Sequence, residues 1–311
     1  MERLSENKLI IVARRTRLDE LVIRFNTTAQ AKFYVEHLGA DFSDYVCEHE
    51  NYYRVLTETR AVLSCLGRVQ VVDRSFLPNF LFGPEDIVFA VGQDGLVANT
   101  LKYLSGQVLI GVNPDPNRWD GVLLPFQVDD LGKIVPEVFK QKRPIKEVTL
   151  AQVVLNDGQT LLAVNDFFIG QKTHVSARYT LGINGREERQ SSSGIIVSTG
   201  LGSTGWMKSI VHGASQLLAQ LLDEQPLVAN EKLPWDIPYL VFFVREPFPS
   251  RIFSANLVFG RIPEQKPLRV LSEMAENGVI FSDGIENDYL SFNSGMEALI
   301  MPADQKGQLI V

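Results

Sequence analysis

The sequence is poor in the residues that build metal sites and disulfides. Its 311 residues include two cysteines and four histidines. Cys47 and Cys65 lack the paired spacing of a zinc site, and the histidines form no metal spacing and adjoin no serine or cysteine nucleophile. We therefore expect no disulfide framework, no metal held by a dedicated protein site and no acyl-transfer triad. The scarcity of cysteine favours a reducing compartment, which we take to be the cytoplasm.

Long apolar runs and an excess of positive charge are also missing. The N-terminal segment lacks the long apolar core of a secretory signal, and the apolar run Tyr239 to Val244 is too short to span a membrane. The net charge of −7 argues against a general nucleic-acid binder. No G-x-x-x-x-G-K-[ST] motif is present, so an ordinary P-loop kinase is excluded. We expect neither a membrane nor a nucleic-acid partner.

What is present is a chain with a 45% hydrophobic fraction, long enough for two domains. Apolar runs alternate with helix-like patterns in the first half, which favours an α/β domain with a parallel Rossmann-like sheet. We expect this domain at residues 1–145, before a charged stretch with a proline. The predicted elements are strands at Leu9–Ala13, Val69–Val72, Ile87–Val91 and Val108–Val112, with helices at Thr28–Leu38 and Asn51–Leu66.

The second half, residues 146–311, reads as a mostly antiparallel β-rich domain. Asn156-Asp157-Gly158 and Asn184-Gly185 each lie between two strand-like runs, as the turns of β-hairpins do. One helix is predicted at Trp206–Leu222. The sequence leaves open whether the last 15 or so residues pack back on the first domain.

The most informative motif is Gly92-Gln93-Asp94-Gly95, which follows the apolar strand Ile87–Val91 and precedes a helical pattern. Glycines let backbone amides approach a ligand closely, and a helix N-terminus favours anionic groups. An aspartate there would repel phosphate, but it suits a hydroxyl that must lose a proton, or a metal ion. The turn therefore predicts phosphoryl transfer.

Three further clusters follow. Asn165-Asp166 after a strand can hold two ribose hydroxyls, although such a pair is more often a turn. Gly200-Leu201-Gly202-Ser203-Thr204-Gly205 has the form G-x-G-x-x-G, but β-rich sequence surrounds it in place of a βαβ unit, which disfavours an ordinary Rossmann site. Trp206 suits stacking on a base or burial in a core about equally. Ser282-Asp283-Gly284 alone predicts a hairpin turn.

Taken in order, these clusters resemble the NAD kinase family, whose members carry GGDGT, an Asn-Glu pair, a TGSTAY-like turn and a C-terminal Asp-Gly. The resemblance runs from about Leu9 to the C-terminus, and the Ser-Ser-Gly before the third cluster looks closest to the mitochondrial-type branch. It implies an active site in the crevice between two domains. It also implies transfer of the γ-phosphoryl group of ATP, with Mg²⁺, to the adenosine ribose 2′-hydroxyl of NAD or NADH, by a homodimer or homotetramer.

The resemblance also implies roles for individual residues. Asp94 would be the catalytic base or a metal-associated carboxylate. The expected substrate- and nucleotide-binding residues are Gly92, Gln93, Gly95, Asn165, Asp166, Thr199, Gly202, Ser203, Thr204, Trp206 and Asp283.

The sequence departs from the family pattern at Gln93, which replaces a glycine, and at Leu96, Asp166 and the Gly205-Trp206 pair. The Gln93 side chain would obstruct the phosphate path, or its backbone would not reach a glycine-only angle. Three alternatives therefore stay open: a kinase of the same fold acting on a sugar or lipid hydroxyl, a catalytically impaired NAD(P)-binding protein and, last, an ordinary Rossmann dehydrogenase.

Overall fold

The computed structural model describes residues 7–226, 232–285 and 288–311. The chain divides into two compact units. Unit 1 comprises residues up to Lys146 together with Gln308–Val311, and unit 2 comprises Glu147–Gly307. Each unit has its own apolar core and is described separately.

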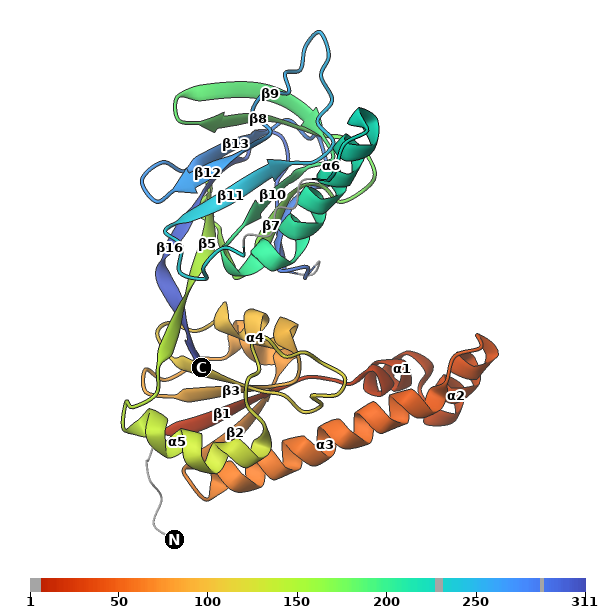
Figure 1. Ribbon diagram of the computed structural model, residues 1–311, viewed down its shortest axis with the longest axis vertical. Coiled ribbons are helices and arrows are strands. Elements are labelled where there is room, and N and C mark those ends of the chain that lie inside the picture. Colours follow the sequence, from red (N-terminus) through yellow and green to blue (C-terminus); the bar gives the residue numbers. More distant parts are fainter. Residues whose placement is uncertain (1–6, 227–231, 286–287) are drawn as a thin grey trace. The chain divides into compact units, whose positions relative to one another are not determined.

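Unit 1 is built around parallel strands in the order β2-β1-β3-β4, followed by the last residues of β16. Figure 1 shows α3 and α5 on one face of this sheet and α4 on the other. Ile87, Phe89 and Val91 of β3 point into the core beneath α3 and α5. The elements are β1 Lys8–Ala13, α1 Arg17–Phe25, α2 Thr28–His37, α3 Phe42–Ser64, β2 Arg68–Asp73, η1 Arg74–Asn79, β3 Ile87–Val91, α4 Asp94–Leu101, β4 Val108–Val112, η2 Val128–Asp130 and α5 Leu131–Phe139.

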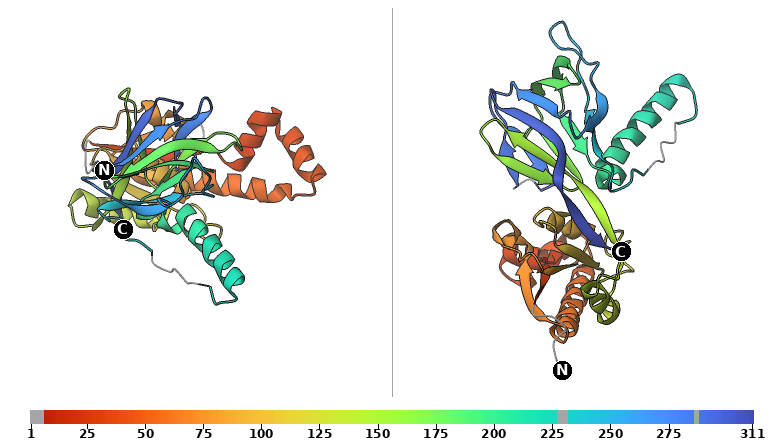
Figure 2. Two further views of the ribbon diagram at one scale, coloured as in Figure 1. Left: turned by 90° about the horizontal axis from the view of Figure 1, so that it is seen from above. Right: turned by 90° about the vertical axis from the view of Figure 1, so that its left-hand side faces the viewer.

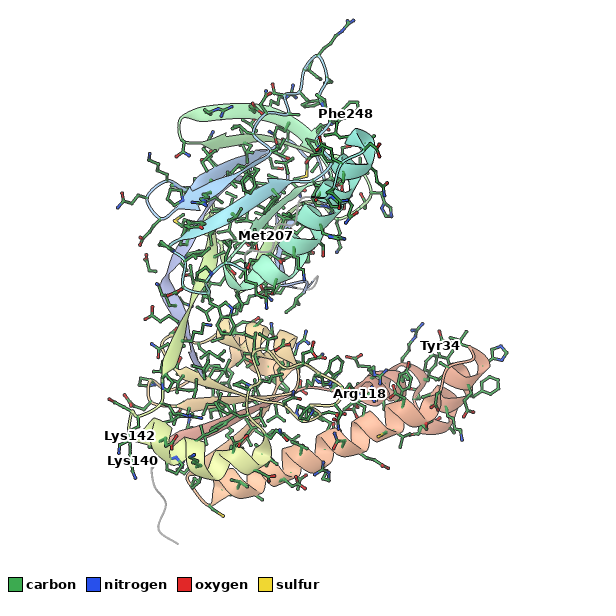
Figure 3. All side chains as sticks on the ribbon, in the orientation of Figure 1. Tyr34, Arg118, Lys140, Lys142, Met207 and Phe248 are labelled. Carbon is green, nitrogen blue, oxygen red and sulfur yellow. The ribbon has the colours of Figure 1, made fainter. Side chains whose placement is uncertain are left out.

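The helices of unit 1 depart from the sequence expectation in two ways. The helix expected at Asn51–Leu66 begins nine residues earlier, because Asp41 caps Phe42–Ser64 by accepting from the amide of Ser43. Helices α1 and α5 were not predicted. Helix α1 starts with a capping box between Thr16 and Asp19 and forms a small core with α2 and α3. Figure 3 labels Tyr34 on the hairpin that α1 and α2 make.

Unit 2 is a sandwich of two antiparallel sheets with apolar side chains of both between them. One sheet contains β9, β8, β13 and β16, with β5 and β6, and the other has the order β12-β11-β10-β7-β14-β15. The elements are β5 Ile145–Leu155, β6 Thr160–Ala163, β7 Asp166–Gln171, β8 Ala177–Ile183, β9 Arg186–Ser192, β10 Ile195–Ser198, η3 Leu201–Thr204, α6 Trp206–Leu222, β11 Tyr239–Val244, β12 Phe259–Pro263, β13 Leu268–Ser272, β14 Gly278–Ser282, β15 Tyr289–Ser291 and β16 Glu297–Ile310.

Both predicted hairpins and the predicted helix are present in unit 2. Asn184 and Gly185 have φ angles of 52° and 76° between β8 and β9, the left-handed pair that a two-residue hairpin turn needs. The other predicted turn, Asn156-Asp157-Gly158, connects β5 to β6, and these two strands pair antiparallel. Helix α6 lies against the outer face of the second sheet. An α/β unit with a parallel sheet and an antiparallel β-rich unit confirm the predicted fold class.

Candidate functional site

The Gly92–Gly95 turn lies at the carboxyl end of β3, where parallel sheets hold their ligands. Gln93 caps α4 with φ −134° and ψ 167°, an extended backbone that any residue adopts. Its carbonyl accepts from the amides of Leu96 and Val97. The proposed conflict between Gln93 and a glycine-only backbone angle is therefore wrong. The structure also makes the turn shorter than the sequence suggested, because Asp94 is already the first residue of the helix.

Asp94 is held by one hydrogen bond and keeps one oxygen free. Its Oδ1 accepts from the amide of Leu123 at 2.7 Å, and no described residue donates to Oδ2. The Asp94 side chain is half-buried. An extra Cβ on Gly95 would have no neighbour within 4 Å, so packing does not demand a glycine there. The turn thus offers a free carboxylate oxygen, and the N-cap side chain of Gln93 makes no capping hydrogen bond to the start of α4.

The segment that reaches Asp94 follows β4 and folds back along it. Gly111 makes this possible, since a Cβ there would lie 2.0 Å from the Leu123 carbonyl oxygen. Asn113 ties the segment down: its amide donates to Phe126 and its side chain donates to the Trp119 carbonyl. Gly111 and Asn113 therefore position Asp94 indirectly. No local pattern in the sequence indicates the bond from Leu123 to Asp94, which joins residues 29 positions apart.

Side chains that no sequence motif singles out support the same turn from α3 and the end of β1. The Tyr52 hydroxyl accepts from the Arg14 amide at 2.8 Å and donates to the Val91 carbonyl at 3.2 Å, which joins the ends of β1 and β3. Burial raises the pKa of Tyr52 to about 12, so this hydroxyl keeps its proton. Arg14 pairs with Glu48 at 2.8 Å and lies next to Gly92, and its buried Nε has no hydrogen-bond partner among the described residues. Only the final structure brings these distant residues together.

A second group of charges lies around α1 and α3. Asp44 binds both Arg17 and Arg118, which Figure 3 labels. These hydrogen bonds, that from Arg118 first, hold the pKa of Asp44 well below its usual range. The group fixes the loop after β4, which carries Arg118, to the long helix.

The Asn165-Asp166 pair of unit 2 is fixed by Asp283. One Asp283 oxygen accepts from the amides of Val164 and Asn165 at 3.0 and 2.6 Å. The Asp283 amide in turn donates to the Asp166 carbonyl. Asp283 and Gly284 have φ angles of 55° and 70°, which agrees with the predicted hairpin turn. The Asp283 carboxylate thus holds the strand that carries the predicted ribose-binding pair.

Asp166 has the most altered acidity of the predicted residues. It is buried at the start of β7, and burial followed by the negative charge of Asp283 raises its pKa to about 7. Near neutral pH it exists in both forms and is able to donate or accept a hydrogen bond. The Asn165 side chain beside it is half-buried.

In the turn from Thr199 to Trp206, the Thr199 and Ser203 hydroxyls form hydrogen bonds with backbone groups of unit 2. The Thr199 hydroxyl donates to the Val164 carbonyl and accepts from Gly202, while the Ser203 hydroxyl donates to Gly200 and accepts from Leu233. A Cβ on Gly202 would lie 2.1 Å from the Asn165 carbonyl oxygen. Thr204 is exposed. Because β10 pairs antiparallel with both neighbours, no βαβ unit surrounds the turn, which argues against a Rossmann site.

Trp206 lines a pocket of about 300 Å³ on the outer face of the second sheet. Its ring stacks on Phe168 at 6.0 Å, and the Arg245 guanidinium lies over it at 5.5 Å. Besides Gln171 and Val279, the pocket is lined by aromatic rings and two cations: Phe168, Trp206, Phe281, Tyr289, Lys172 and Arg245. Such walls suit a flat ring that carries an anionic group. Asp166 and Phe168 alternate along β7, and Lys172 follows directly after that strand; this spacing was the available sequence signal for this face.

No dedicated metal site is found among the described residues. Within residues 7–226, 232–285 and 288–311, no group of three or more His, Cys, Asp or Glu side chains is placed to hold a metal ion. No helix in the same ranges is long and apolar enough to cross a membrane.

The chain is similar to NAD kinases in sequence and in structure, although no family model matches it. It is 27% identical over 133 residues to NAD kinase 2 of Geobacillus kaustophilus; the match covers 42% of this chain and about half of that relative, 49%. The NAD kinase of Archaeoglobus fulgidus, solved with ATP, aligns over 98% of this chain and 93% of its own, at 14% identity and a TM-score of 0.56.

A second solved structure is also similar to this chain. Yeast NADH kinase, complexed with NADH, covers 99% of this chain and 84% of its own, at 14% identity and a TM-score of 0.60. At this identity the likeness establishes the fold that the chain shares with these kinases.

Proposed function

We propose that the chain is an ATP-dependent NAD(H) kinase. It transfers the γ-phosphoryl group of ATP to the 2′-hydroxyl of the adenosine ribose of NAD or NADH. The observation that carries this proposal is the free Oδ2 of Asp94 at the start of α4. The sequence likeness to an NAD kinase and the fold shared with NAD and NADH kinases support it.

In this mechanism each part of the Gly92–Gly95 turn has one task. Asp94 Oδ2 accepts the proton of the ribose hydroxyl as its oxygen attacks the γ-phosphorus, and the bond to the β-phosphate oxygen breaks to release ADP. The amides at the start of α4, with the dipole of the helix, stabilise the negative charge of the phosphoryl group. Gly95 leaves room for that group, since no side chain lies beside it.

The proposal includes a divalent metal, and the residues present fit one that arrives with ATP. Mg²⁺ is commonly held by substrate phosphates, water and one or two carboxylates in place of an all-protein cage. Because Asp94 Oδ1 accepts from Leu123 and Oδ2 acts as the base in this mechanism, the phosphates of ATP and water would hold the metal. The metal would supply charge neutralisation at the phosphates.

Unit 2 supplies the proposed nucleotide contacts. Asn165 and Asp166 bind ribose hydroxyls, and the near-neutral pKa of Asp166 allows it either hydrogen-bonding role. Trp206 and the pocket it lines receive an aromatic ring, with Arg245 and Lys172 near anionic groups. Thr199, Gly202, Ser203 and Asp283 contribute by shaping the strand ends that carry these contacts. Membership of the mitochondrial-type branch, a homo-oligomeric state and a cytoplasmic location remain part of the proposal.

The test is formation of NADP or NADPH from ATP, Mg²⁺ and NAD or NADH by the full chain. We expect Asp94→Asn to lower kcat by about 10²–10⁴-fold, the usual worth of a positioned general base. Asp129→Asn, at an exposed carboxylate of the same unit, should leave kcat unchanged. Equal activity of the wild type and Asp94→Asn would disprove the proposed role.

The same purified chain distinguishes the alternative functions. ADP release with a sugar or lipid alcohol, and none with NAD or NADH, would indicate the kinase with another acceptor. Calorimetric binding of NAD(P) without ADP release would indicate the impaired binding protein. The extended backbone of Gln93 removes one of the two structural reasons for the latter, and obstruction of the phosphate path by the Gln93 side chain is the reason that stays open to test.

A further inference from the structure

Arg14 follows β1 directly and carries a buried charge, since the residue is 8% exposed. Two of its side-chain nitrogens are hydrogen-bonded: Nη1 donates to the Arg15 carbonyl at 2.9 Å, and Nη2 donates to the Glu48 carboxylate at 2.8 Å. The third nitrogen, Nε, has no acceptor among the residues that the structure describes. A buried donor of a charged group is unfavourable without a partner, so the Nε–H is suited to a group that binds beside it.

The Arg14 Nε lies beside the first glycine of the Gly92–Gly95 turn. A Cβ on Gly92 would stand 3.5 Å from Nε and 3.4 Å from Cδ of Arg14. The same Cβ would lie 3.0 Å from Cδ2 of Leu96, which is tighter than an ordinary contact. The lack of a side chain at Gly92 therefore brings the Arg14 guanidinium next to the backbone of the turn.

The position of Arg14 is fixed through its backbone and its side chain together. The Tyr52 hydroxyl accepts from the Arg14 amide and donates to the Val91 carbonyl, so it joins Arg14 to the strand end that precedes Gly92. The Arg14 guanidinium also lies 5.1 Å from the centroid of the Tyr52 ring. A donor held in this way loses little conformational freedom when it binds an anion, which favours binding.

Glu48 balances the charge of Arg14 only in part. Its other carboxylate oxygen accepts from Arg17 Nε, so two arginines share one buried carboxylate. Glu48 lies on α3 and Arg17 begins α1; Figure 2 shows these helices together at one side of unit 1. Among the residues with described positions, no other carboxylate pairs with Arg14. The guanidinium thus keeps a donor and part of its positive charge for the Gly92–Gly95 turn.

A phosphate oxygen is the acceptor that suits this arrangement. Guanidinium N–H groups form strong, charge-assisted hydrogen bonds with phosphate. The dipole of α4, which begins at the same turn, also favours negative charge there. A cation beside Gly92 further offsets the repulsion between the Asp94 carboxylate and phosphates that approach it.

We propose that Arg14 binds a phosphate group of the nucleoside triphosphate donor through its Nε–H. The inference rests on the proposed kinase function, to which it adds a binding residue outside the glycine-rich motif. Nη1 and Nη2 keep their bonds to Arg15 and Glu48, so binding of the phosphate breaks no hydrogen bond of the chain. Because the contact exists before and during transfer, it lowers KM for ATP more than it raises kcat.

The experiment is calorimetric binding of magnesium tripolyphosphate to the full chain, which measures the phosphate contact without a base or a ribose. Arg14→Lys keeps a positive charge opposite Glu48 but removes the Nε–H. We expect it to raise the dissociation constants of tripolyphosphate and of ATP by about 10–100-fold, the usual worth of a hydrogen bond to a charged group. The dissociation constant of adenosine, which has no phosphate, should stay unchanged.

Arg143→Lys is the matched control. Arg143 is another arginine of unit 1 that pairs with a glutamate, Glu137, and its Nε likewise has no hydrogen-bond partner within the described ranges. Its guanidinium lies over the Phe126 ring and is not among the nearest neighbours of Gly92. This change should leave the affinity for tripolyphosphate as it is in the wild type.

A second variant covers the case in which Arg14→Lys does not fold. Arg14→Gln with Glu48→Gln removes both members of the buried pair, so neither charge is left without its partner. It should weaken tripolyphosphate binding by a larger factor than Arg14→Lys, because the positive charge is lost as well. Urea unfolding and circular dichroism show which variants are folded.

Three outcomes overturn the proposal. The first is a wild type that binds neither tripolyphosphate nor ATP, and the second is a folded Arg14 variant that binds both as tightly as the wild type. The third is a loss of the same size for adenosine, or in Arg143→Lys. Tripolyphosphate binding that depends on Arg14, without formation of NADP(H), would contradict only the proposed acceptor. Formation of NADP(H) with unchanged tripolyphosphate affinity in the Arg14 variants would contradict only the role of Arg14.

Discussion

Two glycine-rich turns of the chain lie between a strand and a helix, and they differ in how closely other atoms pack against their glycines. At Gly92–Gly95 of unit 1, Gly95 has open space beside it and Asp94 keeps a free oxygen. At Gly200–Gly205 of unit 2, a Cβ on Gly200 or Gly202 would lie about 2 Å from a carbonyl oxygen, at 1.9 and 2.1 Å. Glycine-rich sequence between a strand and a helix thus arises both from an open turn and from a packed one.

The polar residues of the two regions differ in the same way. In unit 2, the hydroxyls of Thr199 and Ser203 and the carboxylate of Asp283 form hydrogen bonds with backbone groups. Asp94, in contrast, accepts from a backbone amide with Oδ1 and leaves Oδ2 available. A residue that matches a binding motif can therefore shape a site without touching its ligand, and the comparison predicts which substitutions damage the fold and which damage the chemistry.

The largest effect on stability should come from Asp283→Ala. Two backbone amides near the Asn165-Asp166 pair lose their acceptor, and each unpaired donor costs roughly 1–3 kcal/mol, about 2–6 kcal/mol in total. Urea unfolding of the full chain measures this loss. Asp157→Ala, at an exposed hairpin aspartate of the same unit that bonds only within its turn, should cost under about 1 kcal/mol. Equal losses in the two variants would show that Asp283 does not hold the strand.

The acidity of Asp166 gives the next effect, which depends on pH. Its pKa of about 7 in the folded chain lies above the ordinary value of 3.8, so folding favours the protonated form. The stability from this group is complete below about pH 4 and is lost as the pH rises through about 7. At about 1.4 kcal/mol per pKa unit, the loss between pH 4 and pH 8 is roughly 2–4 kcal/mol.

Asp166→Asn isolates this contribution because it stays neutral throughout. Urea unfolding at several pH values should show wild-type stability falling relative to the variant as the pH rises. A difference between the two proteins that is independent of pH would mean that Asp166 titrates normally.

Much of this organisation follows from local sequence, and the rest depends on packing between distant residues. The apolar run before Gly92 and the alternation along β8 predict strands, since their periodicity is local. Helix α1 was missed because its stability rests on a capping box and a small core with α2 and α3. The bonds from Leu123 to Asp94 and from Tyr52 to Val91 join residues 29 and 39 positions apart, which no local pattern reveals.

Glycine-to-alanine changes in unit 1 separate structure from chemistry. Gly111→Ala places a Cβ against the Leu123 carbonyl, which should cost about 1–3 kcal/mol of overpacking and displace the amide that holds Asp94. Both unfolding stability and kcat should fall. Gly95→Ala meets no neighbour in a helix and should raise stability by about 0.5–1 kcal/mol, while it raises KM for ATP if the phosphates pass there.

The two substitutions are expected to change the stability in opposite directions. Unfolding measurements and steady-state kinetics on both variants therefore test the prediction. A Gly95→Ala enzyme with unchanged kinetics would mean that the space beside Gly95 receives no substrate. A Gly111→Ala enzyme with full activity would mean that the Leu123 bond is not needed to orient Asp94.

The smallest effect is expected for Gln93→Gly, and it tests how open the Gly92–Gly95 turn is. Because Gln93 already has an extended backbone, glycine relieves no strain and should lower stability by only about 0.5–1 kcal/mol through added chain entropy. We expect kcat with ATP and NAD or NADH to change within about threefold, roughly 0.7 kcal/mol in the barrier. A gain of tenfold or more would show that the glutamine side chain blocks the phosphate path. The turn of unit 1 would then be partly closed by its own side chain, as the turn of unit 2 is closed by its backbone, and the chain would be better described as an impaired kinase.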